Sequence, residues 1–468
     1  MLPSYTLLKQ RLKAIIANKR QQGYDIRGID REFSSLPNNY EELDCFAKKL
    51  NQLDYRDDWP YTEPDELEDI WQQCELADNK TQAHWLSAVP HDIEDRIAAA
   101  FQSSLCGCIL GKPIEINPTL DMLKVAGEKI HEWPISNYIS VDFLDQLGNR
   151  HDSWEETTRE NIQYVAADDD INYTLIGMLV IEEHGLGFST NDVRQKWLDL
   201  LPVSMTFGPE RTLLAKSAID AISENNPSEM QLKEWVQVWN AGDEYCGALI
   251  RMDAYGYACP GQPKLAAELA YKDASFTHRK TGLYSSMFIA AAISLAPVVE
   301  EPIEIFEFAL KFVPKNSRFY EIVADSILQI RSSSDWMEAY TKIHGKYGEY
   351  CHCQIYQEIG TLINTIHFAT DIGDAICKQV SQGNDTDSFG ATCGSIAGLL
   401  MGPSKLDPKW LKPFDDKIVT SLSGFKDYSI SSLTKRVKNL SALVKQEQKG
   451  QRVFERKQKI IIDIDRGI

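Results

Sequence analysis

The sequence predicts an all-α protein, an orthogonal multi-helix bundle with an N-terminal helical extension. Apolar residues recur at helical spacing along most of the 468 residues. Stretches in which apolar and polar residues alternate, as they do in strands, are scarce. Hydrophobic residues make up 43% and charged residues 25%, which is ordinary for a globular protein. A chain of this length can bury one large helical core and still carry an appended region.

We expect three parts along the chain. Residues 1–90 form the N-terminal helical extension, residues 91–440 the main domain, and residues 441–468 a charged C-terminal tail. The extension is polar and acidic, with helices expected at residues 5–19 and 40–53, and Pro60, Pro64 and Pro90 interrupt the stretch after these helices. Its role is either that of a packing appendage or that of a lid or docking element.

From residue 93 onward the sequence becomes apolar and rich in small residues. A helix is expected there, ended by Gly111 and Pro113 in the usual order. Further helices are expected from the same periodicity at residues 173–183, 211–223, 263–271, 284–296, 303–312, 318–330, 361–368 and 371–380. A last helix of very small residues follows Gly390 and includes Gly394 and Gly398.

Charge and composition indicate which classes of molecule this protein is not expected to bind. The formal net charge is −19, so free nucleic acid is not expected as a general partner. The N-terminus lacks the basic start and apolar run of a signal peptide, and we expect no window long and apolar enough to cross a bilayer. We therefore expect a cytoplasmic protein without a membrane partner. Ten cysteines fit reduced, buried thiols, although the close pairs Cys106/Cys108 and Cys351/Cys353 leave metal ligation as an alternative.

The segment 383–390 carries the strongest chemical signal. Asp385 and Asp387 lie one residue apart and Ser388 follows them, which makes a compact set of oxygen ligands before the small-residue helix. Hard divalent cations such as Mg²⁺ are held by carboxylates, hydroxyls and water. A polar turn that caps the helix is the alternative interpretation.

A second acidic cluster, Asp168, Asp169 and Asp170, precedes an apolar helix far upstream. One carboxylate at a helix N-terminus is favourable, but three in a row repel one another unless they are solvated or bridged by cations. A solvated helix cap is again the alternative. Taken together, the two clusters offer five aspartates and a serine, a set that suits two Mg²⁺ ions, with Mn²⁺ as the alternative ion.

Four separated segments, taken together, resemble the ADP-ribosylglycohydrolase family, the all-helical enzymes related to dinitrogenase reductase-activating glycohydrolase. The segments are residues 107–115, 168–170, 272–278 and 385–398. The resemblance covers roughly residues 93–440 and leaves the first ninety outside it. Asp168 stands where the family often has a threonine, and Cys108 stands where an aspartate is common. Ser388 replaces a threonine and keeps the hydroxyl.

The resemblance implies hydrolysis of an N- or O-glycosidic bond at the anomeric carbon of ADP-ribose. The metal ligands are then Asp168, Asp169, Asp170, Asp385, Asp387 and Ser388. Asp169 or Asp387 is the candidate to accept a proton from the attacking water. Glu115, in the loop after the first family helix, is a further catalytic candidate near the site, with an ordinary surface glutamate as the alternative.

The sequence signal for substrate contacts is weaker than the signal for metal ligands. Arg251 could bind a phosphate and Tyr255 or Tyr257 could stack on adenine, unless Arg251 and Asp253 form an internal network. Asn384 and Phe389 flank the downstream aspartates and are candidates to touch the ribose. His278, beside Thr277, is either a substrate contact or a hydrogen-bonded core residue.

The primary hypothesis is a Mg²⁺-dependent hydrolase that removes ADP-ribose from a protein side chain or a small conjugate. Two alternatives remain open. One is a hydrolase of another ribosyl or nucleoside-like glycoside, and the other is a protein that binds ADP-ribose without turnover.

Overall fold

The computed structural model describes residues 3–220, 227–350, 352–425 and 428–450. These residues contain 24 α-helices, several short 3₁₀ turns and no β-strand. The expected all-α fold is therefore confirmed. The end of the helix expected at 211–223 and residue 351 lie outside the described residues.

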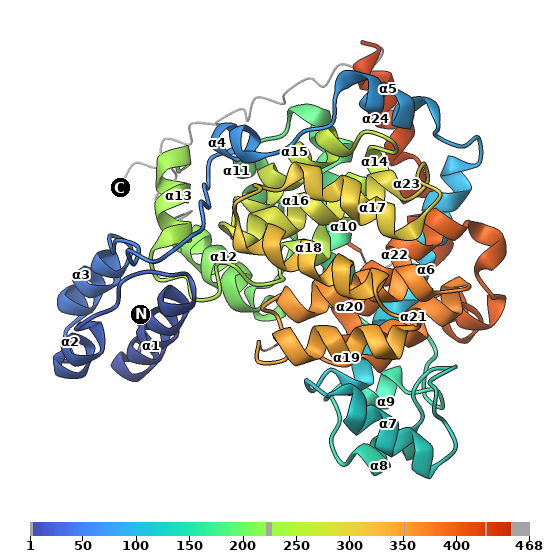
Figure 1. The fold of residues 1–468 in the computed structure, drawn as a ribbon, viewed down its shortest axis with the longest axis horizontal. Helices are drawn as coiled ribbons and strands as arrows, with labels where there is room; N and C mark the ends of the chain where they lie inside the picture. The colour runs from blue at the N-terminus through green and yellow to red at the C-terminus, as the bar shows by residue number, and fades with distance from the viewer. Residues whose placement is uncertain (1–2, 221–226, 351, 426–427, 451–468) are drawn as a thin grey trace, which may run out of the picture.

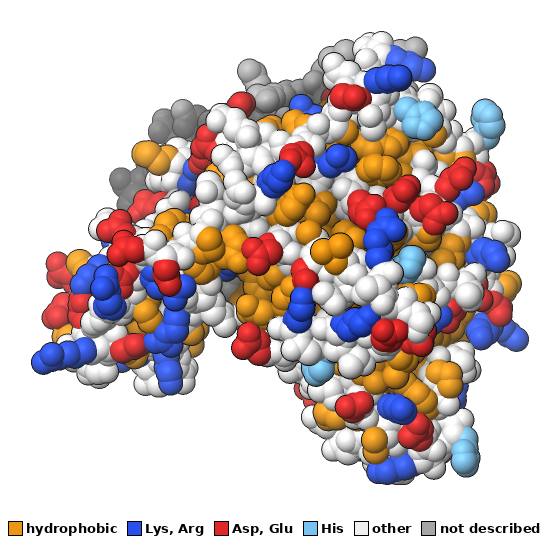
Figure 2. Space-filling model, viewed as in Figure 1, with side chains coloured by type: hydrophobic (Ala, Val, Ile, Leu, Met, Phe, Trp, Pro, Cys, Tyr) orange, Lys and Arg blue, Asp and Glu red, His pale blue; other side chains and the backbone are white. Residues whose placement is uncertain are grey.

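The first three helices form a small lobe beside the main body (Figure 1). They are α1 (Tyr5–Gln21), α2 (Ile29–Ser35) and α3 (Tyr40–Leu50). Their apolar faces meet in a core of their own, which includes Leu12, Ile16, Leu43 and Leu50 and reaches Val238 of the main body. Acidic and basic side chains are interspersed on the outside of this lobe (Figure 2). The extension is thus a folded lobe with its own small core.

Buried ion pairs join the strap, residues 51–66 between α3 and α4, to the main body. The Arg318 guanidinium lies between Glu63 of the strap and Glu244 of the body. Its Nε is 2.8 Å from the Glu63 Oε1, and its Nη2 is 2.8 Å from the Glu244 Oε2. Asp65 pairs with Arg279 at 2.8 Å. Because these groups are largely buried, losing one partner would leave a charge without its counter-ion, and the strap is held firmly.

The remaining helices build the main body (Figure 1). Before the family-like region lie two short helices, α4 (Leu67–Gln73) and α5 (Asn79–Ser87). The first half of the body contains α6 (Ile93–Gly111), α7 (Leu120–Lys129), α8 (Val141–Leu147), α9 (Trp154–Thr157), α10 (Asp169–His184), α11 (Thr190–Leu200), α12 (Gly208–Asp220) and α13 (Glu229–Gln237). The second half contains α14 (Asp253–Ala258), α15 (Pro263–Ala274), α16 (Thr281–Leu295), α17 (Pro302–Ala309), α18 (Arg318–Arg331), α19 (Trp336–Tyr347), α20 (Tyr356–Phe368), α21 (Ile372–Ser381), α22 (Thr386–Met401), α23 (Ile430–Lys438) and α24 (Leu440–Gln448).

Helices α6 and α22 approach each other until their backbones touch. A Cβ atom added to Gly107 would lie 2.0 Å from the carbonyl oxygen of Gly390, and one added to Gly394 would lie 2.3 Å from that of Ser103. At the end of α6, the Thr386 hydroxyl donates a hydrogen bond to the Gly111 carbonyl at 2.9 Å. Small residues on both helices are therefore required for this contact.

One sequence expectation about the membrane needs correction. Ile93–Ile114 is long and apolar enough to cross a bilayer by length and composition, with a mean hydropathy of 1.3. Its alanines and serines dilute the apolar run, so the window is easily overlooked in the sequence. In the structure 83% of it is buried inside the protein, where it forms the centre of the core.

The expected C-terminal tail is partly structured. Leu440–Gln448 is helix α24, with Leu440 and Val444 buried, and the Glu447 carboxylate accepts a hydrogen bond from the backbone N–H of Leu186. The beginning of the segment expected as a tail at 441–468 therefore packs on the body. Residues 451–468 lie outside the described residues.

The α6–α22 contact leads to a stability prediction. Replacing Gly394 by alanine should lower the free energy of unfolding by about 1–3 kcal/mol, because the new methyl group meets a backbone carbonyl that cannot turn aside. Gly345→Ala in α19 is the matched control, since no atom lies within 4 Å of its added Cβ. That change should raise stability by about 0.5–1 kcal/mol. Urea unfolding of both variants measures the difference, and equal effects would contradict the close contact.

Candidate active site

A cavity of about 370 Å³ opens where the two acidic clusters meet. Its walls come from η1 (Lys112–Ile114) and the residue after it, the first turns of α10, α12 and α22, and the segment before α14. The lining residues that carry chemistry are Lys112, Glu115, His151, Asp168, Asp169, Asn172, Tyr173, Glu210, Tyr245, Cys246, His352, Cys353, Asp385 and Ser388. Phe207 and Met205 lie at the same cavity and are 57% and 47% exposed. The cavity thus combines an acidic floor with apolar side chains that face solvent.

Lys112 joins the two acidic clusters. Its Nζ lies 2.8 Å from the Asp168 Oδ2, 2.8 Å from the Asp387 Oδ2 and 2.8 Å from the Glu115 Oε2. The residue is 8% exposed. Segments more than two hundred residues apart in sequence are therefore brought together around one ammonium group.

Local structure fixes the two acidic segments. Asp168 is the N-cap of α10 and accepts a hydrogen bond from the backbone N–H of Asp170 at 2.9 Å. The other segment enters α22 through Gly383, whose φ is +81° and whose added Cβ would lie 2.2 Å from the Pro118 carbonyl oxygen. The backbone N–H of Asn384 donates to that same carbonyl at 2.8 Å. The first turns of both helices thus start from rigid loops.

Burial and mutual repulsion shift the pKa values of these carboxyl groups. Burial, with Asp387 as the next cause, raises the pKa of Glu115 to about 10. The pKa values of Asp169 and Asp170 are also raised, first by burial and then by Asp168. Asp387 is the exception, because Lys112 outweighs burial and lowers its pKa to about 2. Lys112 shows the reverse balance: burial alone would lower its pKa, but the surrounding aspartates hold it well above its usual value.

Glu358 of α20 is a member of the site that the sequence analysis missed. Its Oε1 accepts a hydrogen bond from the backbone N–H of Asp385 at 3.0 Å, and its Oε2 is buried without a hydrogen-bond partner. Burial raises its pKa to about 8. No sequence signal marks it, because it lies inside an otherwise ordinary amphipathic helix.

The donor set fits a divalent cation. Both carboxylate oxygens of Asp170 are buried without a partner, as is the Oε2 of Glu358. Ligand atoms of Glu115, Asp385 and Asp387 lie within 4.8 Å of one another, and so do those of Cys108, Asp168 and Asp170. Buried oxygens of this kind are costly unless a cation or a proton satisfies them.

Two cysteines from different segments line the same cavity. The Cys246 thiol donates to the Asp385 Oδ2 at 3.4 Å, and ligand atoms of Cys246, Cys353 and Asp385 lie within 4.8 Å of one another. The Cys353 thiol and then burial raise the pKa of Cys246 well above its usual value. Among the pairs considered from sequence spacing, Cys106 and Cys108 are buried in α6. Cys351 lies outside the described residues.

Arg251 is not at the cavity, contrary to the phosphate-binding prediction. Its side chain is 1% exposed and pairs with Glu210 at 2.7 Å and with Asp273 at 2.5 Å. It also donates to the Thr277 hydroxyl. The internal network is therefore the correct alternative, but its acidic partners are Glu210 and Asp273 rather than Asp253.

Four other predicted substrate contacts are also absent from the cavity lining. Tyr257 and Phe389 are fully buried, and the Tyr257 hydroxyl contacts Ser395 and Asp253. His278 is 1% exposed, and burial followed by Arg251 lowers its pKa well below the usual value. Asn384 is half-buried in the loop before α22. These residues support the core and the loop, and none of them lines this cavity.

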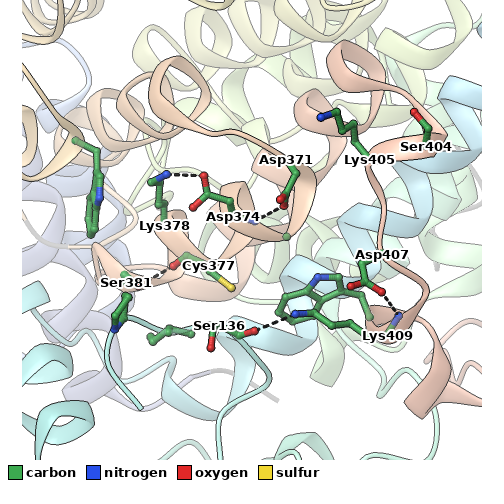
Figure 3. A pocket seen from close by; sticks show the side chains of 15 residues that line it. Ser136, Asp371, Asp374, Cys377, Lys378, Ser381, Ser404, Lys405, Asp407 and Lys409 are labelled. Carbon is green, nitrogen blue, oxygen red and sulfur yellow. Dashed lines mark hydrogen bonds and ion pairs between the residues drawn. The ribbon is translucent and has the colours of Figure 1, made fainter. Parts of the chain in front are cut away.

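A larger cavity of about 690 Å³ lies elsewhere, between α21 and residues 404–410 (Figure 3). Its acidic side chains are engaged locally: Asp371 caps α21, Asp374 pairs with Lys378, and Asp407 accepts from the backbone N–H of Lys409. Among the described residues, none of the convergent metal-ligand groups falls here. The smaller cavity is therefore the better candidate active site despite its size.

The best candidate site of this all-helical fold is therefore a cavity lined by carboxyl groups. The model of one family, ADP-ribosylglycohydrolase, matches residues 89–448. The chain belongs to the ADP-ribosylglycohydrolase family, whose members are metal-dependent glycosidases that act on ADP-ribosylated substrates.

A solved structure is also similar to this chain. It is described as "ADP-ribosylglycohydrolase-related protein complex", and it matches with a TM-score of 0.48 and 14% sequence identity, over 76% of this chain and 100% of that one. In a sequence comparison, none of the curated proteins matches.

The Arg251 network gives a prediction that separates a structural role from ligand binding. Arg251→Met should lower the free energy of unfolding by about 3–5 kcal/mol, because Glu210 and Asp273 would remain buried without their counter-ion. Arg331→Met on the surface is the control and should change stability by less than about 0.5 kcal/mol. Urea unfolding checks both. A stable Arg251→Met protein that had lost only ADP-ribose affinity would restore the phosphate-binding hypothesis.

The raised carboxyl pKa values predict how stability depends on pH without metal. Unfolded glutamates titrate near pH 4, whereas Glu358 in the folded protein titrates at about 8. The folded state therefore holds the proton more tightly, so its contribution to stability is complete below about pH 4 and is lost as the pH rises to about 8. The free energy of unfolding in EDTA should fall between pH 5.5 and 8, by up to about 1.4 kcal/mol per pH unit for each such group.

Glu358→Gln provides the matched comparison for this effect. The amide does not ionise, so the variant should lose less stability than the parent protein over the same pH range. Urea unfolding at pH 5.5 and 8 measures both slopes. Identical slopes would show that Glu358 does not hold a proton in the folded protein.

Proposed function

We propose that this protein is a divalent-metal-dependent glycohydrolase that releases ADP-ribose from a conjugate, with Mg²⁺ as the first candidate ion and Mn²⁺ as the second. The observation that carries the proposal is the convergence of Asp168–Asp170 and Asp385–Ser388 at one cavity in a member of this family. The sequence predicts two such ions. The substrate is an ADP-ribosylated protein side chain or a small conjugate.

The residues that would hold the metal are Asp168, Asp169, Asp170, Asp385, Asp387 and Ser388, as predicted from the sequence. A bound divalent ion would supply a fixed positive charge that orients the ribose hydroxyls and polarises the attacking water. Seven carboxyl groups, those of the five aspartates with Glu115 and Glu358, surround this place. Their mutual repulsion supports a requirement for a cation.

Of the two candidates for the proton acceptor, Asp169 is the better placed. Asp169 is half-buried and lines the cavity, whereas Asp387 is 1% exposed and holds Lys112. The low pKa of Asp387 also makes it a weak base. In this proposal Asp169 takes a proton from water as the water oxygen bonds to the anomeric carbon.

Glu115 is the candidate to protonate the leaving group. It lines the cavity, its side chain is 30% exposed, and its raised pKa keeps it protonated near neutral pH in the metal-free protein. When the glycosidic bond breaks, its electron pair stays on the leaving nitrogen or oxygen, which then takes the proton from Glu115. Such an acid and base pair is the usual solution for glycoside cleavage.

The rest of the cavity suits the other end of the substrate. Phe207 and Met205 present apolar surface to solvent, and a flat base such as adenine packs well against such side chains. They replace Tyr255 and Tyr257 as the proposed adenine contacts, because both tyrosines are fully buried.

Direct assay tests this function. Purified protein should release free ADP-ribose from ADP-ribosylated arginine, serine or nucleic acid when Mg²⁺ or Mn²⁺ is present, and EDTA should abolish the release. Chromatography of the products identifies which acceptor is used. Calorimetric titration with ADP-ribose gives a separate outcome: tight binding with no turnover of any conjugate would favour the binding-protein alternative, and release from another ribosyl glycoside would favour the second hydrolase.

Substitution of the proposed base should impair turnover specifically. Asp169→Asn should reduce kcat by about 10²–10⁴-fold, the range that general base catalysis contributes. Asp374→Asn at the other cavity is the matched control and should keep its activity, because Asp374 pairs with Lys378 and accepts from Thr370 and does not line the candidate active site. Steady-state kinetics with saturating metal decide the matter. Full activity of Asp169→Asn would remove it from the mechanism.

A further inference from the structure

Lys112 occupies a position that a metal ion would otherwise be expected to fill. Its Nζ lies 2.8 Å from one oxygen each of Glu115, Asp168 and Asp387. An ammonium group carries three N–H donors and one positive charge, and here it faces three carboxyl groups from three separate segments. Among the described residues, Lys112 is the only lysine or arginine in the cavity lining.

The backbone around Lys112 keeps it there. Lys112 follows Gly111, where an added Cβ would lie 2.2 Å from the Thr386 carbonyl oxygen, and Pro113 comes directly after it. The lysine therefore starts from a point in direct contact with the first turn of α22, next to Asp387. A long side chain at this point cannot reach solvent without leaving three carboxylates unpaired.

The ammonium satisfies only part of the acidic cluster. Asp170 keeps two buried oxygens without a partner, and Glu358 keeps one. Asp169 and Asp385 also face the cavity without a lysine or arginine partner in the described structure. The carboxyl groups left over after Lys112 is counted are enough to hold a further cation.

We propose that this site is a hybrid centre, in which the Lys112 ammonium holds one cation position and a single divalent ion binds at one of the two convergent ligand groups, that of Glu115, Asp385 and Asp387 or that of Asp168 and Asp170. This inference rests on the proposed function for the identity of the site and changes the predicted count from two ions to one. Lys112 is then a positioning residue for the metal centre, because it orders Asp168, Asp387 and Glu115 without a second metal.

Metal stoichiometry tests this inference without any substrate. Mn²⁺ titrations followed by calorimetry and by electron paramagnetic resonance should find one ion per chain, with the spectrum of an isolated Mn²⁺. Lys112→Ala removes the charge and opens the space, so this variant should bind two ions whose spectra show spin coupling. Lys112→Met removes the charge but fills the space with an uncharged chain, so it should bind no more than one.

A distant lysine controls for the loss of a buried ammonium group. Lys280 is 2% exposed and donates to the Tyr24 and Tyr55 hydroxyls, away from the cavity, so Lys280→Met should retain one ion. Circular dichroism establishes that each variant is folded before its ions are counted. Two coupled ions in the parent protein, no ion in it, or a single ion in folded Lys112→Ala would each overturn the hybrid centre.

The outcome is separable from that of the hydrolase assay. A parent protein that binds one Mn²⁺ and cleaves no conjugate would keep the hybrid centre and overturn the proposed function. A parent protein that binds two coupled ions and releases ADP-ribose would do the reverse.

Discussion

The backbone contact between α6 and α22 is the constraint on which the site depends. Gly107 and Gly390 touch through their main chains, and Gly394 lies against the carbonyl of Ser103. At this separation the end of α6 and the start of α22 must fall side by side. Lys112 and Asp387 meet because the two helix backbones are in direct contact, with no larger side chain between them. The small residues of α22 thus set the distance between the two acidic segments and the lysine that joins them.

This closeness has an electrostatic consequence. Helix N-termini favour carboxylates, and two such N-termini, those of α10 and α22, point their aspartates at one place. Seven carboxyl groups in a largely buried volume would be strongly unfavourable if all were ionised. The raised pKa values of Glu115, Asp169, Asp170, Asp385 and Glu358 show that protons relieve the repulsion when no metal does. A divalent ion bound as proposed would displace these protons, which would tie its affinity to pH.

Sequence reasoning reached the helices and the acidic loops because both have local signals. Helical periodicity and N-caps depend on residues only a few positions apart, and each aspartate cluster is a short run of adjacent residues in the sequence. Its failures share one cause. Whether Arg251 faces a phosphate or Glu210 and Asp273 depends on contacts 41 and 22 residues away in sequence. Lys112 looks like an ordinary charged end of a helix, and Glu358 like one polar residue of α20. Nothing local distinguishes a buried partner from a solvated one.

The N-terminal lobe contacts residues that lie close in sequence to one wall of the cavity. The Gln22 side chain donates to Asp243 at 2.9 Å, and Gln354 donates to Gln21. Asp243 and Gln354 lie close in sequence to Cys246 and Cys353, the two cysteines beside Asp385. None of the described residues of the lobe lines the cavity itself. A lid would have to reach the opening of the cavity, whereas these contacts hold the segments that form one of the cavity's walls. The position of the lobe therefore favours the packing interpretation over the lid, with the added consequence that its small core supports the segment next to Asp385.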